Sequence, residues 1–295
     1  MNLFRALYDR LPDHARRDLR SWVPDPVLRW YAHRKTEVYL ISYPKCGRTW
    51  LRLMIGQAIA AHFGLPQDEN TLFVRWKNRP HPQAPHITVV HDDRPMLKAP
   101  GELEKSKKRY RSKRVIFLAR DPRDVIVSSY FEMKNRGTLF GDNPYERRKA
   151  VFDGSLAEFI HRPQGGFDTI LAYYNIWAKN RDLPKGFLLV RYEDMKTDPC
   201  GQLRRVVDFL GLEAIPDAIL NGAVEFASFE NMRKMETQGK FNSGILNPAD
   251  QQNTDTYKTR KGIVKGYLEY LDEEEIAFLN ARVSEDLSPI FGYSA

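Results

Sequence analysis

Residues 38–50 read VYLISYPKCGRTW, and a helical pattern continues from about Thr49 to His62. Residues 38–42 predict a short buried strand, and residues 43–49, which we call the cradle loop, predict a tight turn that leads directly into the helix. Such a turn aims several backbone N–H groups and the positive end of the helix dipole at one point, which suits a phosphate or sulfate oxyanion. The segment therefore predicts an α/β protein with an anion site after its first strand.

Three residues of the cradle loop suit an oxyanion by their chemistry. Gly47 permits close approach of the backbone, Thr49 adds a hydroxyl donor and Lys45 supplies a point charge. The common nucleotide P-loop pattern, G-x-x-x-x-G-K-[ST], is absent from the sequence, and no predicted strand ends in the pattern expected for a magnesium-holding Asp. These two absences argue against a kinase or an NTPase.

The order of strand, loop and helix recurs further along the chain. Residues 114–119 predict a second apolar strand, after which Asp121 and Pro122 suit the N-cap and the first position of a helix that runs to about Lys134. Residues 186–192 predict a third strand. Strands that alternate with helices indicate a parallel sheet covered on both faces. Further helical patterns cover about 199–210 and 272–287.

We expect one α/β domain, a central parallel sheet flanked by helices, over residues 37–295. Residues 1–36 contain three prolines, which favour short helices, and we expect this segment to cap the domain. A basic amphipathic segment that touches a membrane surface is the alternative. Residues 66–96 and 235–258 are rich in Pro, Asn, Gln and Asp, and they are long enough to be functional loops.

Composition and charge limit the classes of partner. The chain has 295 residues, 42% of them hydrophobic, and a formal charge of +8, which attracts anions such as nucleic acid, acidic lipid or a polyanionic small molecule. The best apolar run, residues 51–61, contains Arg52 and Gln57, so we predict no transmembrane span. The densest basic cluster, residues 105–114, is typical of a solvated face or loop before a strand, so we expect no specific nucleic-acid partner. The N-terminus lacks the apolar core of a secretory signal, and only Cys46 and Cys200 occur, so the sequence favours a cytoplasmic location.

Both strand–helix junctions resemble motifs of the cytosolic sulfotransferases that use 3′-phosphoadenosine 5′-phosphosulfate (PAPS). Residues 43–50, which are the cradle loop and Trp50, match Y-P-K-S-G-T-T-W at six of eight positions, with Cys46 in place of the Ser and Arg48 in place of the first Thr. Residues 120–130, RDPRDVIVSSY, resemble the family's 3′-phosphate motif, R-[ND]-P-[KR]-D-x-x-x-S-x-[YF]. This second resemblance implies that Arg120 and Ser128 hold the 3′-phosphate of the nucleotide.

Three later segments extend the resemblance to roughly residues 37–285. RYEDM, from residue 191, resembles R-Y-E-D-[LM], which implies that Tyr192 contacts the adenine. ASFENM, from residue 227, resembles T-S-F-x-x-M, which implies that Phe229 stacks on the adenine. A third match, R-K-G, implies that a loop wraps the 3′-phosphate; its residues are Arg260, Lys261 and Gly262.

The resemblance implies a P-loop-kinase-like sulfotransferase fold, PAPS as co-substrate, adenosine 3′,5′-bisphosphate (PAP) as product, and no metal. It implies a 5′-phosphosulfate site in the cradle loop, made by Lys45, Cys46, Gly47, Arg48 and Thr49. It implies an adenine site made by Trp50, Tyr192 and Phe229, although ordinary core packing also explains each of these aromatic residues. Because a helix N-terminus and a lysine lower a thiol pKa, Cys46 invites a nucleophile hypothesis, but we expect it to be a small loop residue.

His91 is the candidate general base. A histidine pKa suits proton removal near neutral pH, and the family carries K-T-H-[LMF]-P in the region of residues 89–93, VVHDD, so the resemblance implies that His91 is the base. A purely structural histidine, or a base role for Asp92 or Asp93, is the alternative.

Val89 replaces the lysine of that family motif, and the proline is absent. Another cation is therefore needed to neutralise charge on the sulfuryl oxygens during transfer, and Arg48 and Lys98 are the candidates. Residues 263–267, IVKGY, also depart from the animal enzymes' pattern, which indicates a distant branch and leaves the acceptor open.

We predict in-line transfer of a sulfuryl group from PAPS to a hydroxyl or amine of a small-molecule, lipid or glycan acceptor. His91 would take the proton, and Lys45 would stabilise charge on the bridging oxygen. The alternatives are a PAPS- or PAP-binding protein without transfer, suggested by Val89, and a nucleotide-dependent kinase. Aromatic residues in the loops are candidates to line an acceptor pocket; they are Phe73, Trp76, Phe140 and Phe241.

Overall fold

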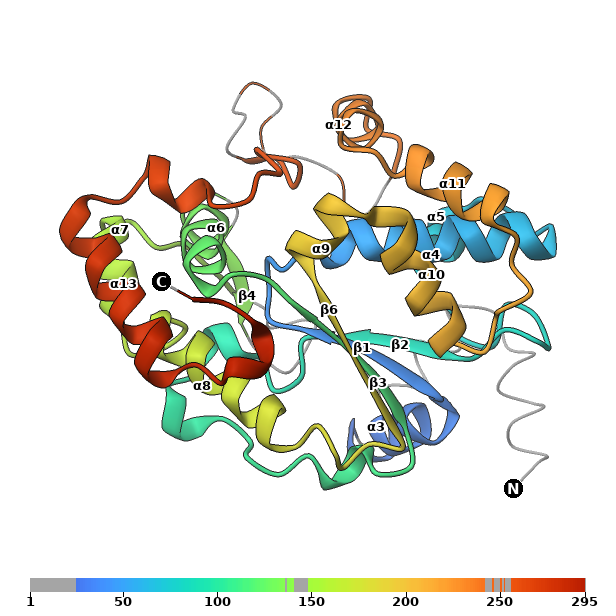
Figure 1. The fold of residues 1–295 in the computed structure, drawn as a ribbon, viewed down its shortest axis with the longest axis horizontal. Helices are drawn as coiled ribbons and strands as arrows, with labels where there is room; N and C mark the ends of the chain where they lie inside the picture. Colours follow the sequence, from blue (N-terminus) through green and yellow to red (C-terminus); the bar gives the residue numbers. More distant parts are fainter. Residues whose placement is uncertain are drawn as a thin grey trace.

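The computed structural model describes residues 25–135, 137–140, 148–241, 246, 250, 252 and 256–294. At its centre lies a four-stranded parallel sheet in the order β2-β1-β3-β6 (Figure 1). The strands are β1 (Val38–Ser42), β2 (Ile87–Val90), β3 (Arg114–Ala119) and β6 (Gly186–Arg191). The predicted α/β class and the predicted strands are confirmed, except that the last strand ends one residue early because Tyr192 begins a helix.

The two central strands are buried, as their sequences require. β1 is buried along its whole length, and every residue of β3 after Arg114 is buried. Strands covered on both faces need apolar side chains at successive positions, which is why these segments read as continuous apolar runs rather than as alternating patterns. Phe117 of β3 packs among aromatic rings from Tyr173, Trp177 and Phe291.

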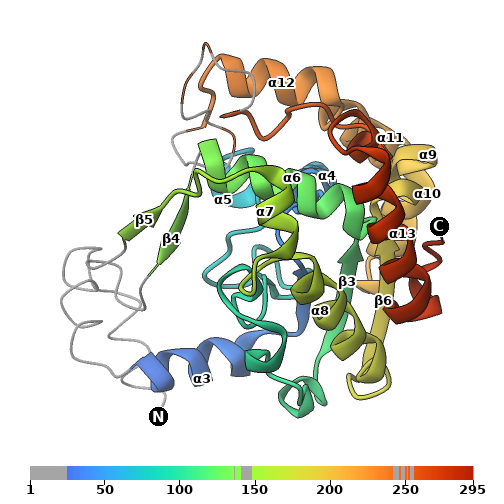
Figure 2. The same ribbon diagram turned by 90° about the vertical axis from the view of Figure 1, so that its left-hand side faces the viewer.

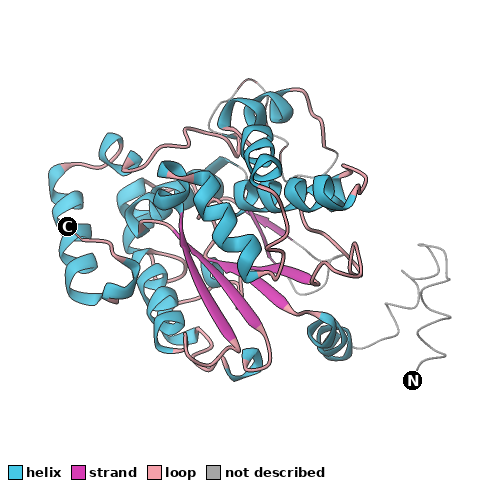
Figure 3. Cartoon of the chain, turned by 45° about the vertical axis from the view of Figure 1, so that its right-hand side comes forward, coloured by secondary structure: helices cyan, strands magenta, loops and turns pink. Residues whose placement is uncertain are grey.

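Helices cover both faces of the sheet, and Figure 3 shows the strands between two groups of them. In the first group α4 packs against α5, α10 and α11, and in the second α6 packs against α7 and α8. The helices are α3 (Asp25–Lys35), α4 (Arg48–Phe63), α5 (Glu69–Leu72), α6 (Pro122–Asn135), α7 (Leu156–His161), α8 (Phe167–Lys179), α9 (Tyr192–Thr197), α10 (Pro199–Phe209), α11 (Asp217–Phe226), α12 (Phe229–Thr237) and α13 (Glu273–Asp286).

Two segments lie apart from this core in Figure 2. A short antiparallel pair, β4 (Thr138–Phe140) with β5 (Arg148–Ala150), stands beside α6 and was not predicted. Helix α3 lies within residues 1–36, for which a cap is predicted, and residues 1–24 lie outside the described part of the chain. In the described part of the chain, no helix is long and apolar enough to cross a membrane.

The register of the sheet fixes where the functional residues gather. Val38 is level with both Ile87 and Arg114, and Arg114 is level with Gly186, so all four strands begin at the same level and end within two residues of one another. In a parallel sheet the segments that follow the strands therefore meet at one edge. The cradle loop and the residues that follow β2, β3 and β6 all lie at this edge.

Candidate functional site

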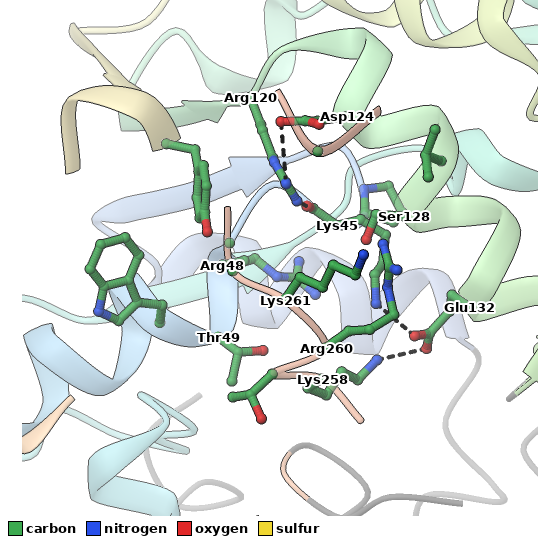
Figure 4. Close-up of a pocket in the computed structure, with 18 of the residues that line it drawn as sticks. Lys45, Arg48, Thr49, Arg120, Asp124, Ser128, Glu132, Lys258, Arg260 and Lys261 are labelled. Carbon is green, nitrogen blue, oxygen red and sulfur yellow. Dashed lines mark hydrogen bonds and ion pairs between the residues drawn. The ribbon is translucent and has the colours of Figure 1, made fainter. Parts of the chain in front are cut away.

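A cavity of about 590 Å³ opens at the carboxyl edge of the sheet. It is lined by His91 and by every residue that the resemblance assigns to the cofactor, except Cys46. The sheet register brings together the cradle loop, His91, Arg120 and Tyr192, and later segments add Phe229 and the R-K-G loop. Figure 4 shows the charged side chains directed into the same space.

The cradle loop has the backbone shape of an anion site. Lys45 and Gly47 both have positive φ, 73° and 86°, and α4 begins immediately afterwards without a side-chain N-cap. The N–H groups of an uncapped first turn need an external acceptor, and an oxyanion is a suitable one. A Cβ at Gly47 would lie 2.5 Å from the Tyr192 ring, so this close approach requires glycine.

Cys46 is buried inside the loop. Its Sγ lies 3.3 Å from the Tyr174 hydroxyl, and burial raises the pKa of the thiol to about 12. A thiol with this pKa stays protonated near neutral pH and is a poor nucleophile. The structure therefore favours the interpretation of Cys46 as a small packed residue of the loop.

Glu132 links two walls of the cavity and was not among the predicted residues. Its carboxylate accepts hydrogen bonds from Lys45 at 2.7 Å and from Lys258 at 2.6 Å (Figure 4). Burial alone would raise the pKa of Glu132, but the two lysines hold it well below its usual range, so it is ionised. The spacing in the sequence could have identified Glu132 as a cavity residue, because Asp124, Ser128 and Glu132 follow at intervals of four and therefore share one face of α6.

His91 is held in one tautomer beside Arg48 of the cradle loop. Its Nδ1 lies 3.0 Å from the carbonyl oxygen of Ser42, which can only accept, so Nδ1 carries the proton. Its Nε2 therefore has the free lone pair and accepts a hydrogen bond from Arg48 at 2.6 Å. Burial, and then the Arg48 charge, hold the pKa of His91 well below its usual range, so the imidazole is neutral.

The two aspartates next to His91 have structural partners. Asp92 is buried and pairs with Lys107 at 2.7 Å and with Arg109, and it accepts a hydrogen bond from Tyr110. Neither Asp92 nor Asp93 lines the cavity, so the alternative of an aspartate base is not supported.

Lys98 is held on a separate carboxylate. It pairs with Asp93, whose other oxygen accepts the backbone N–H of Glu104 at 2.5 Å. Lys98 also lies outside the cavity lining, whereas Arg48 lines it. Of the two candidate cations for the sulfuryl oxygens, Arg48 is therefore the one at the site.

Arg120 is held at the end of β3 by several contacts. It donates to the Lys45 carbonyl at 3.3 Å, pairs with Asp124 at 3.4 Å, and lies 4.5 Å from the centre of the Tyr192 ring. Ser128 faces the cavity one turn beyond Asp124. The cradle loop, α6 and the start of α9 thus meet at the Arg120 guanidinium.

The R-K-G loop lies against α6 at the cavity. Arg260 contacts the Phe131 ring and the Tyr270 hydroxyl, and Lys261 pairs with Glu269. Gly262 has a φ of 65°, and a Cβ there would lie 2.6 Å from the Phe229 ring. The loop backbone therefore packs directly under that ring.

The aromatic residues divide between the cavity and the core. Trp50 and Tyr192 line the cavity with ring centres 5.8 Å apart, and Tyr192 begins α9. Of the predicted acceptor residues, Phe73 and Phe241 are wrong, because they are buried against each other at 4.8 Å and do not line the cavity. Trp76 packs against the core instead, and the side chain of Phe140 lies outside the described residues.

Among the residues that the structure describes, no three His, Cys, Asp or Glu side chains lie close enough together to hold a metal ion. The charges that face the cavity are instead those of lysine and arginine, balanced in part by Asp124 and Glu132.

Known proteins match this chain over most of its length. The family model described as sulfotransferase domain matches residues 35–290. Cytosolic sulfotransferase 13 of Arabidopsis thaliana is 28% identical over 248 residues, which cover 76% of this chain and 73% of that protein. Flavonol 4′-sulfotransferase of Flaveria chlorifolia is 27% identical over 274 residues, which cover 86% of this chain and 80% of that protein.

Solved structures share the fold. A mouse sulfotransferase complexed with PAP superposes with a TM-score of 0.55 and 19% identity, over 85% of this chain and 84% of that chain. A retinol dehydratase in complex with retinol and PAP superposes with a TM-score of 0.54 and 19% identity, over 85% and 81%. These matches confirm the predicted fold.

Proposed function

This chain belongs to the sulfotransferase domain family and is a PAPS-dependent enzyme, and we propose that it transfers the sulfuryl group to a small organic acceptor with His91 as general base. The observation that carries the proposal is the tautomer of His91, whose Nε2 lone pair faces the cavity beside the cradle loop. A neutral imidazole in this position can take a proton from a hydroxyl or amine.

We assign the cofactor groups to three parts of the cavity. The cradle loop would hold the 5′-phosphosulfate through its uncapped helix N-terminus, Lys45 and Thr49. Basic and hydroxyl side chains from the end of β3, from α6 and from the R-K-G loop would hold the 3′-phosphate; they are Arg120, Ser128, Arg260 and Lys261, with Gly262 supplying its backbone. Trp50, Tyr192 and Phe229 would enclose the adenine. Supporting this assignment, all of these residues line one cavity whose charged groups are mainly cations.

In the proposed step an oxygen or nitrogen of the acceptor attacks sulfur. The bond between sulfur and the bridging oxygen breaks, and its electron pair stays on PAP. The acceptor proton passes to Nε2 of His91, while Lys45 stabilises the charge that develops on the bridging oxygen. The protein contributes positioning and fixed charge, as in enzymatic phosphoryl transfer.

We propose a small hydroxyl-bearing molecule as the acceptor. Relatives act on flavonols by name, and a structural neighbour was crystallised with retinol. On the His91 side the cavity is lined by Pro95, Met96 and Leu97, which offer an apolar surface to such a ring or chain. A cytoplasmic location remains our prediction, in keeping with the names of the cytosolic relatives.

The proposal is tested first by calorimetric titration with PAP in magnesium-free buffer. We expect micromolar binding to the wild type and a loss of at least about 100-fold in Arg120→Ala/Lys261→Ala, since charged hydrogen bonds contribute about 1.5–3 kcal/mol each. Folded wild-type protein that binds no PAP would overturn the cofactor assignment.

Acceptor screening then separates binding from transfer. With PAPS and a panel of phenols and alcohols, His91→Ala should bind PAP like the wild type but lose turnover by about 100-fold or more. Tight PAP binding with no transfer to any acceptor would instead support a binding protein. Equal turnover by wild type and His91→Ala would exclude His91 as the base.

A further inference from the structure

Arg48 is a cation without a counter-ion in the part of the chain that the structure describes. Its Nη2 donates to His91, its Nη1 is buried without a hydrogen-bond partner, and no carboxylate pairs with it. Burial lowers the pKa of Arg48 to about 10, so the side chain is still charged at neutral pH. A buried, unpaired guanidinium is unfavourable, and it is usually found where an anion is to be bound.

The neighbouring cations are already engaged. Lys45 and Lys258 share the Glu132 carboxylate. Arg52, one turn further along α4, donates Nε to the Phe73 carbonyl at 2.7 Å and does not line the cavity. Arg48 alone among these four both lines the cavity and contacts His91.

The position of Arg48 joins the anion site to the base. It is the first residue of α4, directly after Gly47 of the cradle loop, and its side chain extends to Nε2 of His91. Figure 4 shows it between Lys45 and Thr49, facing the open space of the cavity. An anion in the cradle loop would therefore lie within reach of the guanidinium.

We propose that Arg48 is a catalytic residue that binds an oxygen of the transferring sulfuryl group and thereby uncovers Nε2 of His91. The Arg48 guanidinium occupies the Nε2 lone pair that must accept the proton, and this contact blocks the base. A sulfuryl oxygen offers Arg48 a charged acceptor, and the shift of its hydrogen bond to that oxygen frees the imidazole. This inference rests on the proposed function.

The chemistry balances without a further reactant. The acceptor–sulfur bond forms, the bond from sulfur to the bridging oxygen breaks with its electron pair kept by PAP, and the proton moves to Nε2. Arg48 stays protonated throughout and changes only its hydrogen-bond partner. Because PAP lacks the sulfuryl group, PAP should leave Arg48 on His91, and only PAPS should release the base.

The test compares PAPS with PAP, which differ by the sulfuryl group alone. Both are titrated calorimetrically, without acceptor, into wild type, Arg48→Lys and Arg48→Met. We expect Arg48→Met to weaken PAPS binding by about tenfold or more and PAP binding by less than about threefold, with Arg48→Lys in between.

Arg52→Met is the matched control, because it removes a buried cation of the same helix that neither lines the cavity nor hydrogen-bonds to His91. It should leave the ratio of the two dissociation constants unchanged. Thermal melting checks that the variants fold. Arg48→Met removes an unpaired buried charge and should melt no lower than the wild type. If Arg48→Met does melt lower, Arg48→Lys, which keeps the charge, is used in its place.

A second readout follows the base itself. The groups that face His91 are Arg48 and Arg52 on α4, Lys258 and the Ser42 carbonyl. Loss of the Arg48 charge should raise the pKa of His91, so the acid limb of the kcat/KM profile of Arg48→Met should move to higher pH.

Three results separate the possibilities. Equal weakening of PAP and PAPS would show that Arg48 binds the 5′-phosphate, and it would overturn the inference while leaving the proposed function intact. No weakening of either ligand would overturn the inference as well. A wild type that binds neither ligand would overturn both.

Discussion

At the scale of single residues, Glu132 has an unexpected place in a cavity whose charged residues are mainly Lys and Arg. It brings a negative charge between Lys45 of the cradle loop and Lys258 of the segment before the R-K-G loop. Without Glu132 or an anionic ligand, the charges of Lys45 and Lys258 would repel each other and the other cations that line the cavity. Glu132 therefore acts as an internal counter-ion for the ligand-free protein.

We predict that Glu132→Gln lowers stability in the absence of ligand and that PAP removes much of the difference. The ion pairs are partly exposed, so the expected loss is about 2 kcal/mol, between the values for surface and buried pairs. Saturating PAP supplies anionic partners for the freed lysines. Thermal unfolding with and without PAP measures both effects, and a gap that PAP leaves unchanged would contradict the prediction.

The difference in stability between wild type and Glu132→Gln should depend on pH in a definite direction. Because its pKa in the folded protein lies below the ordinary value of 4.5, Glu132 stabilises the fold above that value and loses this effect as the pH falls below it. The difference between wild type and Glu132→Gln should therefore close in acid. Asp168→Asn is the control, since the pair of Asp168 with Arg282 is exposed and lies away from the cavity.

The sequence located the cavity residues that belong to the strand ends, because a parallel sheet brings such positions together whatever the loops do. It did not reveal the partners of these residues. The contact of Arg48 with His91 and the bridge through Glu132 depend on side-chain directions set by tertiary packing. Phe73 and Phe241 were assigned to the cavity because they are aromatic residues in loops. Residue type alone does not tell whether a side chain points into a cavity or into the core.

At the scale of elements, the R-K-G loop and α12 are joined through one backbone contact. Gly262 has positive φ and lies against the ring of Phe229, and Phe229 is the first residue of α12. We predict that Gly262→Ala pushes this ring away and weakens PAP binding about tenfold, since base–aromatic stacking contributes about 1–3 kcal/mol. Calorimetric titration with PAP provides the measurement.

Gly239→Ala isolates the effect of the ring from that of backbone strain. Gly239 also has positive φ, 58°, but a Cβ there would meet nothing within 4 Å. Both substitutions should cost about 1 kcal/mol of stability from the left-handed backbone, and only Gly262→Ala should affect PAP. A comparable loss of PAP affinity in both variants would contradict the role of the ring contact.

The elements that could be predicted are those with strong local patterns. β1 and β3 are continuous apolar runs, and α6 begins where Asp121 accepts the backbone N–H of Arg123, as expected for a residue at the helix start. The β4–β5 pair was missed because strands of three residues carry too short a pattern. Its pairing is decided by contacts between segments rather than within them.

At the scale of the whole molecule, the cavity is assembled from segments far apart in the chain. The cradle loop, α6, the start of α9, α12 and the R-K-G loop each supply part of its wall. No single segment forms the site, so a ligand that contacts all of them should hold them together. Binding and stability are then coupled through mass action.

We predict that PAP stabilises the fold as a whole and the R-K-G loop in particular. At 100 times its dissociation constant a ligand adds about 2.7 kcal/mol, which corresponds to a rise in Tm of about 5–10 °C for a domain of this size. Hydrogen exchange should slow more for residues 258–262, which line the cavity, than for α13, which does not. Adenosine 5′-monophosphate, which lacks the 3′-phosphate, should give a smaller rise in Tm and little protection of this loop. Equal protection by both nucleotides would show that the loop does not recognise the 3′-phosphate, and the ligand contacts of Arg260 and Lys261 would then have to be reassigned.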